Sequence, residues 1–395
     1  MAEIDHKDRI QTLDIIRGIA LAGILLVNVQ MMTSTSFFKT AYGIQPEAQS
    51  QLDYILNLFI EFFVQGSFVS TFSFLFGMGF YLFMTKAKAK GWNEKKLFTR
   101  RLFILALFGL AHLVLFWLGD ILLTYAVSGF FLLLFYQAKE KTLLTWSIIL
   151  LSLFFLFYST QMLIPEAFLE GMQAQGEALV AQAVQAYSMP FISAEWWQFR
   201  LTEELPMILG QLPVLIPYVL GIFLFGFYAA KKGWFQHARE NRPFFKKLAL
   251  ISLAVTLPFW GLMAYVQVTN DVAGSLTAYY TYDFYLRIGA LPLALFYISV
   301  ITLLTTKEQI SPLLQRFGAM GRMALTNYLS HTVIIVLFIH VTGLFDQISV
   351  LTNMMIVVAV IGMQLIWSPI ILNKYQFGPL EALWRKGTYK GAEKK

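Results

Sequence analysis

The chain has 395 residues, of which 57% are hydrophobic and 13% are charged, and its net charge is +7. A soluble globular chain carries about 25% charged residues, so this composition excludes a water-soluble domain and indicates a polytopic membrane protein. The positive charge does not require nucleic acid, because the basic residues gather on one side, where anionic lipid head groups are the expected partners. The chain holds no cysteine, which excludes disulfides and thiolate chemistry.

Ten apolar stretches are long enough to enter or cross a bilayer, which takes about 20 residues in a helix. Membrane spans must satisfy their own backbone hydrogen bonds, so we expect an all-α polytopic membrane protein with about ten transmembrane helices. For the shorter apolar segment 54–64, crossing, re-entry and an interfacial position all remain open. The predicted spans are roughly residues 13–32, 68–84, 102–118, 121–136, 143–164, 205–230, 248–268, 284–304, 325–344 and 351–372.

Lysine and arginine concentrate in alternate loops, as in the run from Lys86 to Arg101. The loops on the opposite side hold only two such residues, Lys39 and Arg200. Since Lys and Arg accumulate on the cytoplasmic side of a membrane, we predict that both termini are cytoplasmic. Ten spans fit this arrangement and eleven do not. The first span follows a charged start without a convincing cleavage site, so it is predicted to be an uncleaved signal anchor.

The first span contains charged side chains, which lose their hydration in hydrocarbon unless they are paired, hydrated or turned toward a protein cavity. Asp14 and Arg17 are three residues apart on a helix and can neutralise each other on one face. Two interpretations stay open: a pair that fixes the helix at the cytoplasmic edge of the membrane, or part of a binding site. In the second span, Gly77 and Gly79 are predicted to mark close helix packing rather than phosphate binding.

His112 stands in the apolar third span, which runs into Gly119 and Asp120. Burial keeps an imidazole neutral, which suits a proton acceptor, and a nearby carboxylate would orient it. The two side chains lie roughly 12 Å apart along a continuous helix, so direct pairing requires a break at Gly119. A histidine hydrogen-bonded to a neighbouring helix is the other interpretation. No spacing of histidines and carboxylates predicts a metal site, so no metal is expected.

The longest external segment, residues 165–204, divides the chain into an N-terminal half (1–164) and a C-terminal half with a cytoplasmic tail (205–395), each with five spans. Apolar residues recur in this segment at helical spacing, which predicts an amphipathic helix. A helix resting on the outer leaflet is the favoured interpretation, and a lid over an external pocket is the alternative. Its apolar face is predicted to consist of Phe168, Met172, Leu179, Ala183 and Tyr187.

The sixth predicted span, 205–230, carries Pro206, Pro213 and Pro217, which kink a helix and free backbone carbonyls. The C-terminal tail, with Trp384 and Arg385, is predicted to be an interfacial anchor rather than a further domain.

Polar residues inside the spans fall into two groups at opposite depths, which suggests a cavity that narrows across the bilayer. The inner group is rich in arginine, whose planar donors suit phosphate, so a phosphorylated cytosolic molecule is a candidate ligand. For Arg100 and Arg101 the cytoplasmic bias of positive charge is the favoured explanation. The inner group is Asp14, Arg17, Arg100, Arg101, Arg322, Asn327, Tyr328 and His331, and the outer group is Asn28, His112, Asp120, Arg287, His340 and Asp346.

Several motifs point to known families: Arg9, Leu13-Asp14, Arg17 to Ala20 and Asn28 in the first span, Phe74 to Met78, Arg101 to Gly109, and Gly119 to Ala126. Over roughly residues 9–135 the chain resembles membrane acyltransferases of the heparan-alpha-glucosaminide N-acetyltransferase type. Over its full length, including Gly321 to Tyr328 and Phe377 to Glu381, it is more similar to the bacterial YeiB-like membrane proteins, with a domain of unknown function in the C-terminal half.

The resemblance implies a multi-pass protein of the bacterial inner membrane, in which an acyl group from cytosolic acyl-CoA passes to a sugar or lipid-linked acceptor at or across the membrane. Asn28 matches an active-site asparagine of the acetyltransferases. Their catalytic histidine follows the first span, whereas here no histidine occurs between His6 and His112. Either His112 supplies the base from a different helix, or the acyl-transfer step is absent.

We therefore favour an integral membrane acyltransferase in which the inner arginines hold the phosphates of acyl-CoA, His112 with Asp120 deprotonates the acceptor, and Asn28 stabilises the oxyanion. The alternative is a transporter or flippase of a small amphipathic or lipid-linked substrate, with Pro213 and Pro217 permitting helix movement. A structural protein without turnover fits poorly with so many buried ionisable groups. Membrane lipids are expected partners, and a homodimer remains open.

Overall fold

The computed structural model describes residues 10–44, 50–269, 272 and 275–391, and within these ranges the chain folds into helices joined by turns. The N-terminal half contains α1 (Gln11–Thr33), α2 (Ser36–Ala41), α3 (Gln51–Phe63), α4 (Ser67–Ala89), α5 (Glu94–Leu115), α6 (Leu122–Leu132), the 3₁₀ turn η2 (Leu133–Phe135), α7 (Glu140–Ser159) and the 3₁₀ turn η3 (Thr160–Leu163). The remainder contains α8 (Glu166–Ser188), α9 (Ala194–Phe199), the π-helical turn η4 (Arg200–Glu204), α10 (Leu205–Lys231), α11 (Arg242–Thr269), α12 (Leu276–Thr305), α13 (Pro312–Arg322), α14 (Ala324–Thr342), α15 (Val350–Lys374) and α16 (Pro379–Tyr389).

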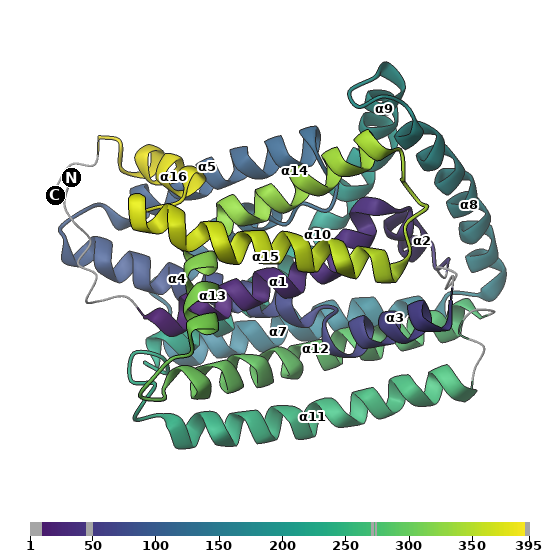
Figure 1. Cartoon of the computed structure of the whole chain (residues 1–395). Coiled ribbons are helices and arrows are strands. Elements are labelled where there is room, and N and C mark those ends of the chain that lie inside the picture. The colour runs from purple at the N-terminus through teal and green to yellow at the C-terminus, as the bar shows by residue number, and fades with distance from the viewer. Residues whose placement is uncertain (1–9, 45–49, 270–271, 273–274, 392–395) are drawn as a thin grey trace.

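The long helices lie side by side along one direction, so the molecule has two ends (Figure 1). The end at the left of Figure 1 carries α16 and the basic loop between α4 and α5, and it is the end that the charge pattern predicts to be cytoplasmic. The opposite, predicted external end carries α2, α8 and α9. The all-α polytopic fold class is therefore confirmed, and the orientation in the membrane stays a prediction.

Each predicted span coincides with a helix, and the described residues contain 9 helices long and apolar enough to cross a membrane. The predicted span 121–136 corresponds instead to a shorter apolar stretch, Leu122–Phe135. At 1.5 Å per residue it reaches about 21 Å, which is less than the roughly 30 Å of a hydrocarbon core. It is short because α5 ends at Leu115 and the turn that follows lies inside the protein instead of at a surface.

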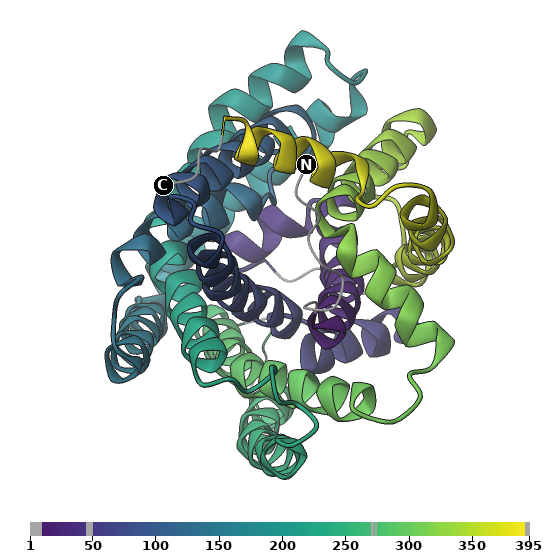
Figure 2. The same cartoon turned by 90° about the vertical axis from the view of Figure 1, so that its left-hand side faces the viewer.

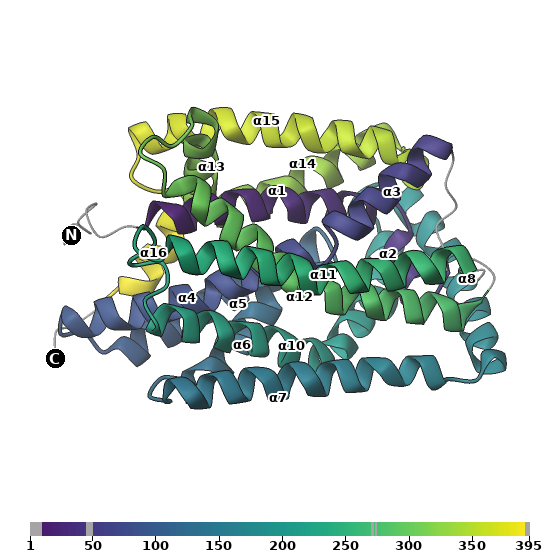
Figure 3. The same cartoon turned by 90° about the horizontal axis from the view of Figure 1, so that it is seen from below.

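Helix α1 is the centre of the bundle, in contact with α4, α12, α13, α14 and α15. The helices surround it when the molecule is viewed along their axes (Figure 2). By contrast, α7 and α15 lie at opposite edges (Figure 3), and with α11 they bury the smallest share of their surface. Polar side chains on α1 are therefore held within the protein, whereas the peripheral helices present apolar side chains to lipid.

Glycines bring the central helices close together. A Cβ at Gly77 of α4 would meet the Phe223 carbonyl oxygen of α10, and a Cβ at Gly226 of α10 would meet the Phe74 carbonyl oxygen in return. Such small residues let membrane helices approach at backbone distance, where van der Waals packing is strongest. The prediction of close packing is confirmed at Gly77, whereas Gly79 faces open space.

Helix α8 forms within the predicted amphipathic segment, and Leu179 and Ala183 are buried as expected. Phe168, however, is 62% exposed, because the buried face of the first turns is set by Leu169 instead. This face packs against α2, α9 and α12, so α8 covers the external end of the protein.

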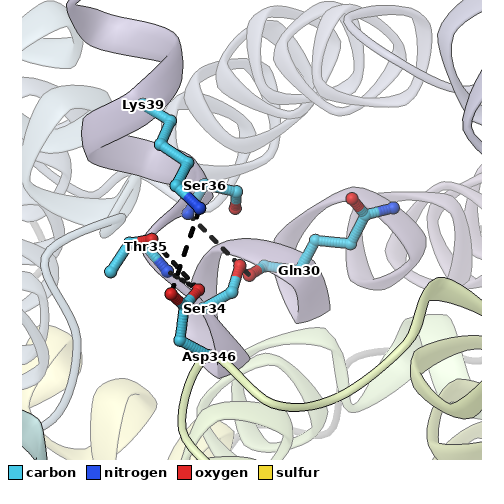
Figure 4. Close-up of polar contacts among 6 residues, drawn as sticks. All are labelled: Gln30, Ser34, Thr35, Ser36, Lys39 and Asp346. Atoms are coloured by element: carbon cyan, nitrogen blue, oxygen red, sulfur yellow. Dashed lines mark hydrogen bonds and ion pairs between the residues drawn. The ribbon is translucent and has the colours of Figure 1, made fainter. Parts of the chain in front are cut away.

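Asp346 joins the α14–α15 loop to the turn after α1 (Figure 4). The backbone N–H and the hydroxyl of Thr35 both donate to its Oδ1 at 3.0 Å, and Lys39 Nζ lies 3.9 Å from its Oδ2. The Asp346 N–H donates to the Thr33 carbonyl at 2.8 Å. Asp346, one member of the outer polar group, therefore holds these two loops together.

Replacing Gly77 by valine should destabilise the folded protein by about 1–3 kcal/mol, because the added side chain forces α4 and α10 apart. The measurement is thermal unfolding of the purified protein in detergent. Gly79→Val, two residues further along the same helix, is the matched control, since no described atom lies within 4 Å of a Cβ built there. Equal unfolding temperatures for the two variants would contradict this packing.

Because the chain has no cysteine, single cysteines report orientation directly. Lys95→Cys at the start of α5 and Glu170→Cys in α8 both replace exposed side chains at opposite ends of the molecule. In intact cells a membrane-impermeant maleimide should label the cysteine at 170 and leave that at 95 unlabelled until the cells are opened. The reverse labelling pattern would mean that the predicted topology is inverted.

Candidate functional site

His112 and Asp120 form a buried pair at the end of α5. His112 Nδ1 lies 2.8 Å from Asp120 Oδ1, and both side chains are 0% exposed. The break that pairing requires is present, since α5 ends at Leu115 and the chain turns back before α6. An ionised carboxylate only accepts hydrogen bonds, so in this pair the N–H at Nδ1 of His112 donates the hydrogen bond to Asp120.

Asp120 is itself held in place by α6. Its second oxygen, Oδ2, accepts a hydrogen bond of 2.7 Å from the N–H of Leu123 in the first turn of that helix. A carboxylate at this position is stabilised by the unpaired N–H groups and the dipole of the helix N-terminus. Gly109 permits the close approach, because a Cβ there would meet Leu123 N and lie 2.9 Å from Asp120 Oδ2.

The second nitrogen of His112, Nε2, is buried and has no hydrogen-bond partner among the described residues. The imidazole ring lies 5.3 Å from the Tyr328 ring and 6.4 Å from the Trp117 ring, measured between centroids. With Nδ1 protonated, Nε2 carries a lone pair. The arrangement is an oriented imidazole whose free nitrogen can accept a proton.

Tyr328 was expected in the inner polar group but lies beside His112. Its hydroxyl accepts a hydrogen bond of 3.4 Å from the N–H of Ile121, next to Asp120. The depth of Tyr328 cannot be estimated from its position along its span, because α14 and α5 begin at different levels. Helix α14 starts at Ala324 after a separate helix, α13, whereas α5 starts within the basic loop.

Asn28 lies half-buried on α1, and its side chain has no hydrogen-bond partner among the described residues. One turn further along, the Met31 carbonyl accepts a hydrogen bond of 3.4 Å from Trp117 Nε1. Trp117 also contacts the His112 ring, so Asn28 and His112 stand on adjoining elements at the same end of the bundle.

Arginines gather at the predicted cytoplasmic end. The Arg101 guanidinium stacks 3.5 Å from the Trp384 ring of α16 and 5.5 Å from the Phe83 ring of α4. Arg17 and Arg385 lie near enough to repel it electrostatically, and Glu381 lies near enough to attract it. Arg17 is paired with Asp14 at 3.0 Å, as predicted, and keeps 26% of its side chain exposed.

Arg17, Arg101 and Arg385 therefore form one cluster, called here the inner arginine cluster. Arg100 and Arg322 were expected beside them and instead make backbone contacts near the tail: Arg100 donates to the Lys390 carbonyl at 2.6 Å and Arg322 to the Gln376 carbonyl at 3.4 Å. The tail helix α16 packs on α5, and Trp384 Nε1 donates to the Arg101 carbonyl at 2.8 Å. The interfacial position of the tail stays a prediction.

The two ends of the site are related by a simple spacing. On α5, Arg101 precedes His112 by about three helical turns, or roughly 16 Å. On α1, Arg17 precedes Asn28 by the same number of residues. Each arginine thus shares a helix face with its outer partner. Both helices run from the predicted cytoplasmic end toward the external end (Figure 1), so the two pairs are parallel.

Asn327 and His331 belong to a different contact, between α14 and α15. His331 Nε2 lies 2.7 Å from Gln364 Oε1, and Gln364 Nε2 donates to the Asn327 carbonyl at 3.0 Å. Asn327 Nδ2 donates to Ser368 Oγ at 3.1 Å, and Asn327 Oδ1 accepts from Trp367 Nε1 at 2.9 Å. These groups satisfy one another, which is typical of polar contacts that hold membrane helices together.

Arg287 and His340 also lie apart from His112. Arg287 Nε donates to Asp283 Oδ2 at 2.8 Å on α12, and Tyr158 donates to the same oxygen. His340 stands on α14 against Tyr187, Phe191 and Trp196 of the external segment. In the described part of the chain no group of three or more His, Asp or Glu side chains could hold a metal ion.

Two features cannot be predicted from the sequence. The packing of Arg385 near Arg101 depends on the return of the tail onto α5, which its composition does not encode. Arg200 and Glu204 are only loop charges in the sequence, whereas the structure pairs them in a buried position at 2.9 Å.

These features define the class: an all-helical, polytopic membrane protein with a buried histidine–aspartate pair toward one end and an arginine cluster at the other. A family described as "Protein of unknown function (DUF418)" matches residues 229–391. No solved structure matches the chain.

Three relatives match nearly the whole length. The chain is 32% identical to the uncharacterized protein YxaH of Bacillus subtilis, over 97% of this chain and 95% of the relative. It is 30% identical to an uncharacterized 39.9 kDa protein in the amylase 3' region of Bacillus acidopullulyticus (98% and 96%), and 26% identical to the uncharacterized protein YeiB of Escherichia coli (98% and 97%). The chain belongs to this DUF418 family of YeiB-like proteins.

Replacing Gln364 by leucine should lower the stability of the protein by about 1–3 kcal/mol, because His331 Nε2 then loses its partner in a buried position. Thermal unfolding in detergent measures the effect. Gln347→Leu, which alters an exposed glutamine of the α14–α15 loop, is the control and should leave the unfolding temperature unchanged. If the two variants unfold alike, the α14–α15 network contributes nothing to stability.

Proposed function

We propose that the protein is an acyltransferase of the bacterial inner membrane that uses acyl-CoA as donor. The observation that carries the proposal is the buried His112–Asp120 pair, in which Nδ1 is fixed by a carboxylate and Nε2 is left without a partner. A neutral imidazole oriented in this way is the usual general base of acyl transfer.

In the proposed reaction, His112 Nε2 takes the proton of an acceptor hydroxyl or amine as its oxygen or nitrogen attacks the thioester carbonyl. The carbonyl becomes an oxyanion, to which the Asn28 amide is the candidate donor. When the oxyanion collapses, the carbon–sulfur bond breaks, and the departing thiolate takes the proton from the imidazolium. Asp120 stabilises the positive charge that His112 carries between the two steps.

The inner arginine cluster supports the choice of donor. It brings three guanidinium groups to one end of the molecule, with Asp14 beside Arg17 and Glu381 near Arg101, and planar guanidinium donors suit the phosphates of an anionic ligand. The cluster lies roughly 16 Å from His112 along α5. This separation suits a donor whose phosphates bind at the cytoplasmic end while its extended pantetheine arm carries the thioester toward the histidine.

The proposal predicts that His112→Gln, which can still bond to Asp120, lowers acyl transfer by about 10²- to 10⁴-fold because the general base is lost. Asp120→Asn should lower it as well, since the imidazole loses its orientation. The assay follows thiol release from acetyl-CoA by the protein in lipid nanodiscs with a bacterial lipid extract as acceptor. Its background is low because the protein has no thiol of its own.

His237→Gln is the matched control, because His237 is 65% exposed in the loop after α10. Unchanged thiol release in His112→Gln would reject His112 as the base. If the protein releases no thiol at all and instead moves a labelled lipid across a vesicle membrane unchanged, the transporter or flippase hypothesis replaces the acyltransferase.

A further inference from the structure

A second group of buried polar side chains lies at the external end and has no part in the proposed reaction. Trp196 Nε1, Arg200 Nε and His340 Nε2 are buried nitrogen atoms without a hydrogen-bond partner among the described residues. Leaving such a group unpaired in a protein interior is costly, and buried polar atoms are nearly always satisfied by protein, water or a ligand. Glu204 Oε2, 2.9 Å from Arg200 Nη1, also has no hydrogen-bond partner among the described residues. Three unpartnered donors on neighbouring side chains indicate that something outside the chain binds there.

The three side chains are neighbours. The Arg200 guanidinium lies 4.7 Å from the Trp196 ring, and the Trp196 ring lies 6.2 Å from the His340 ring. Trp196 is 0% exposed and Arg200 is 4% exposed. We call this group the external donor cluster.

The other two nitrogens of the Arg200 guanidinium are held by the protein. Its Nη1 donates to the Tyr187 hydroxyl at 3.0 Å and lies 2.9 Å from Glu204 Oε2, and its Nη2 donates to the Leu113 carbonyl at 2.6 Å. Tyr187 donates to Glu204 Oε1 at 2.7 Å. The guanidinium is therefore held rigidly by two of its edges, and its Nε–H is left for a ligand.

The chemistry of the cluster selects an acceptor with several oxygens. The indole and the guanidinium nitrogens can only donate, and the imidazole donates when Nε2 carries its proton. A phosphate group has several oxygens, each with free lone pairs, and Arg favours it for its charge and planar fit.

The position of the cluster points to lipid as the source of that phosphate. It lies on α9, η4 and α14 at the predicted external end (Figure 1), where the head groups of the outer leaflet are expected. Exposed apolar side chains lie nearby in the sequence, with Ile192 at 58% and Leu201 at 50% exposed. Tryptophans such as Trp196 and Trp197 are also typical of this interface.

The backbone that carries the cluster departs from regular geometry. Ile192, in the turn between α8 and α9, has φ of 70°, which is unusual for a β-branched residue. Arg200–Glu204 forms a π-helical turn, a feature that concentrates at functional sites. Both irregularities lie in the segment that presents Trp196 and Arg200.

We propose that Trp196, Arg200 and His340 form a binding site for the phosphate group of an outer-leaflet phospholipid. The full-length protein in detergent is titrated with dioleoylphosphatidylglycerol, with dioleoylglycerol and with inorganic phosphate, and binding is followed by native mass spectrometry and thermal shift. Phosphatidylglycerol should bind and stabilise the protein, whereas dioleoylglycerol, which has the same tails without phosphate, should not.

Trp196→Phe and His340→Phe remove one N–H each while keeping a ring in place, and each should weaken phosphatidylglycerol binding by about tenfold. Trp197→Phe and His237→Phe are the matched controls and should bind as the unaltered protein does. The proposal is overturned if dioleoylglycerol binds equally well, or if Trp196→Phe weakens binding no more than Trp197→Phe. A response to inorganic phosphate alone would assign the site to the free ion and overturn its assignment to lipid.

Discussion

A charged side chain inside a bilayer must be neutralised by the protein itself, and this requirement shapes the whole candidate site. At the end of α5 it is met by His112, by Asp120 and by the first turn of α6, which donates to the second oxygen of the carboxylate. The turn that follows α5 is covered by protein, as backbone within a bilayer must be, and Arg200 from η4 donates to the Leu113 carbonyl in the last turn of α5. The same turn shortens α6. It also requires a residue as small as Gly109 on α5, where Asp120 and Leu123 approach that helix closely.

The central position of α1 explains why functional groups concentrate near it. Lipid-facing helices cannot carry unpaired polar groups, whereas α1 is surrounded by five other helices. Close glycine contacts, such as that between Gly18 of α1 and the Phe317 carbonyl of α13, bring the helices of this arrangement to backbone distance. Asn28 is thus a half-buried amide on the central helix of the bundle.

Two parallel helices connect the ends of the site. On both α1 and α5 an arginine near the predicted cytoplasmic end is followed, about three turns later, by a group suited to acyl transfer. The tail helix α16 completes the inner end by placing Trp384 and Arg385 against Arg101. A donor that is anionic at one end and reactive at the other matches this geometry. The external donor cluster lies beyond it, at the predicted external end.

The sequence by itself determined the helical membrane fold, the position of each apolar helix and the Asp14–Arg17 pair, because these depend on hydropathy and on spacing within one helix. It also identified His112 and Asp120 as partners that would need a break in the helix. Only the tertiary structure decided that the break occurs, that Tyr328 reaches His112, and that Asn327 and His331 bind Gln364 on another helix. Those contacts join residues far apart in the chain, and they depend on how helices pack, which local spacing does not encode.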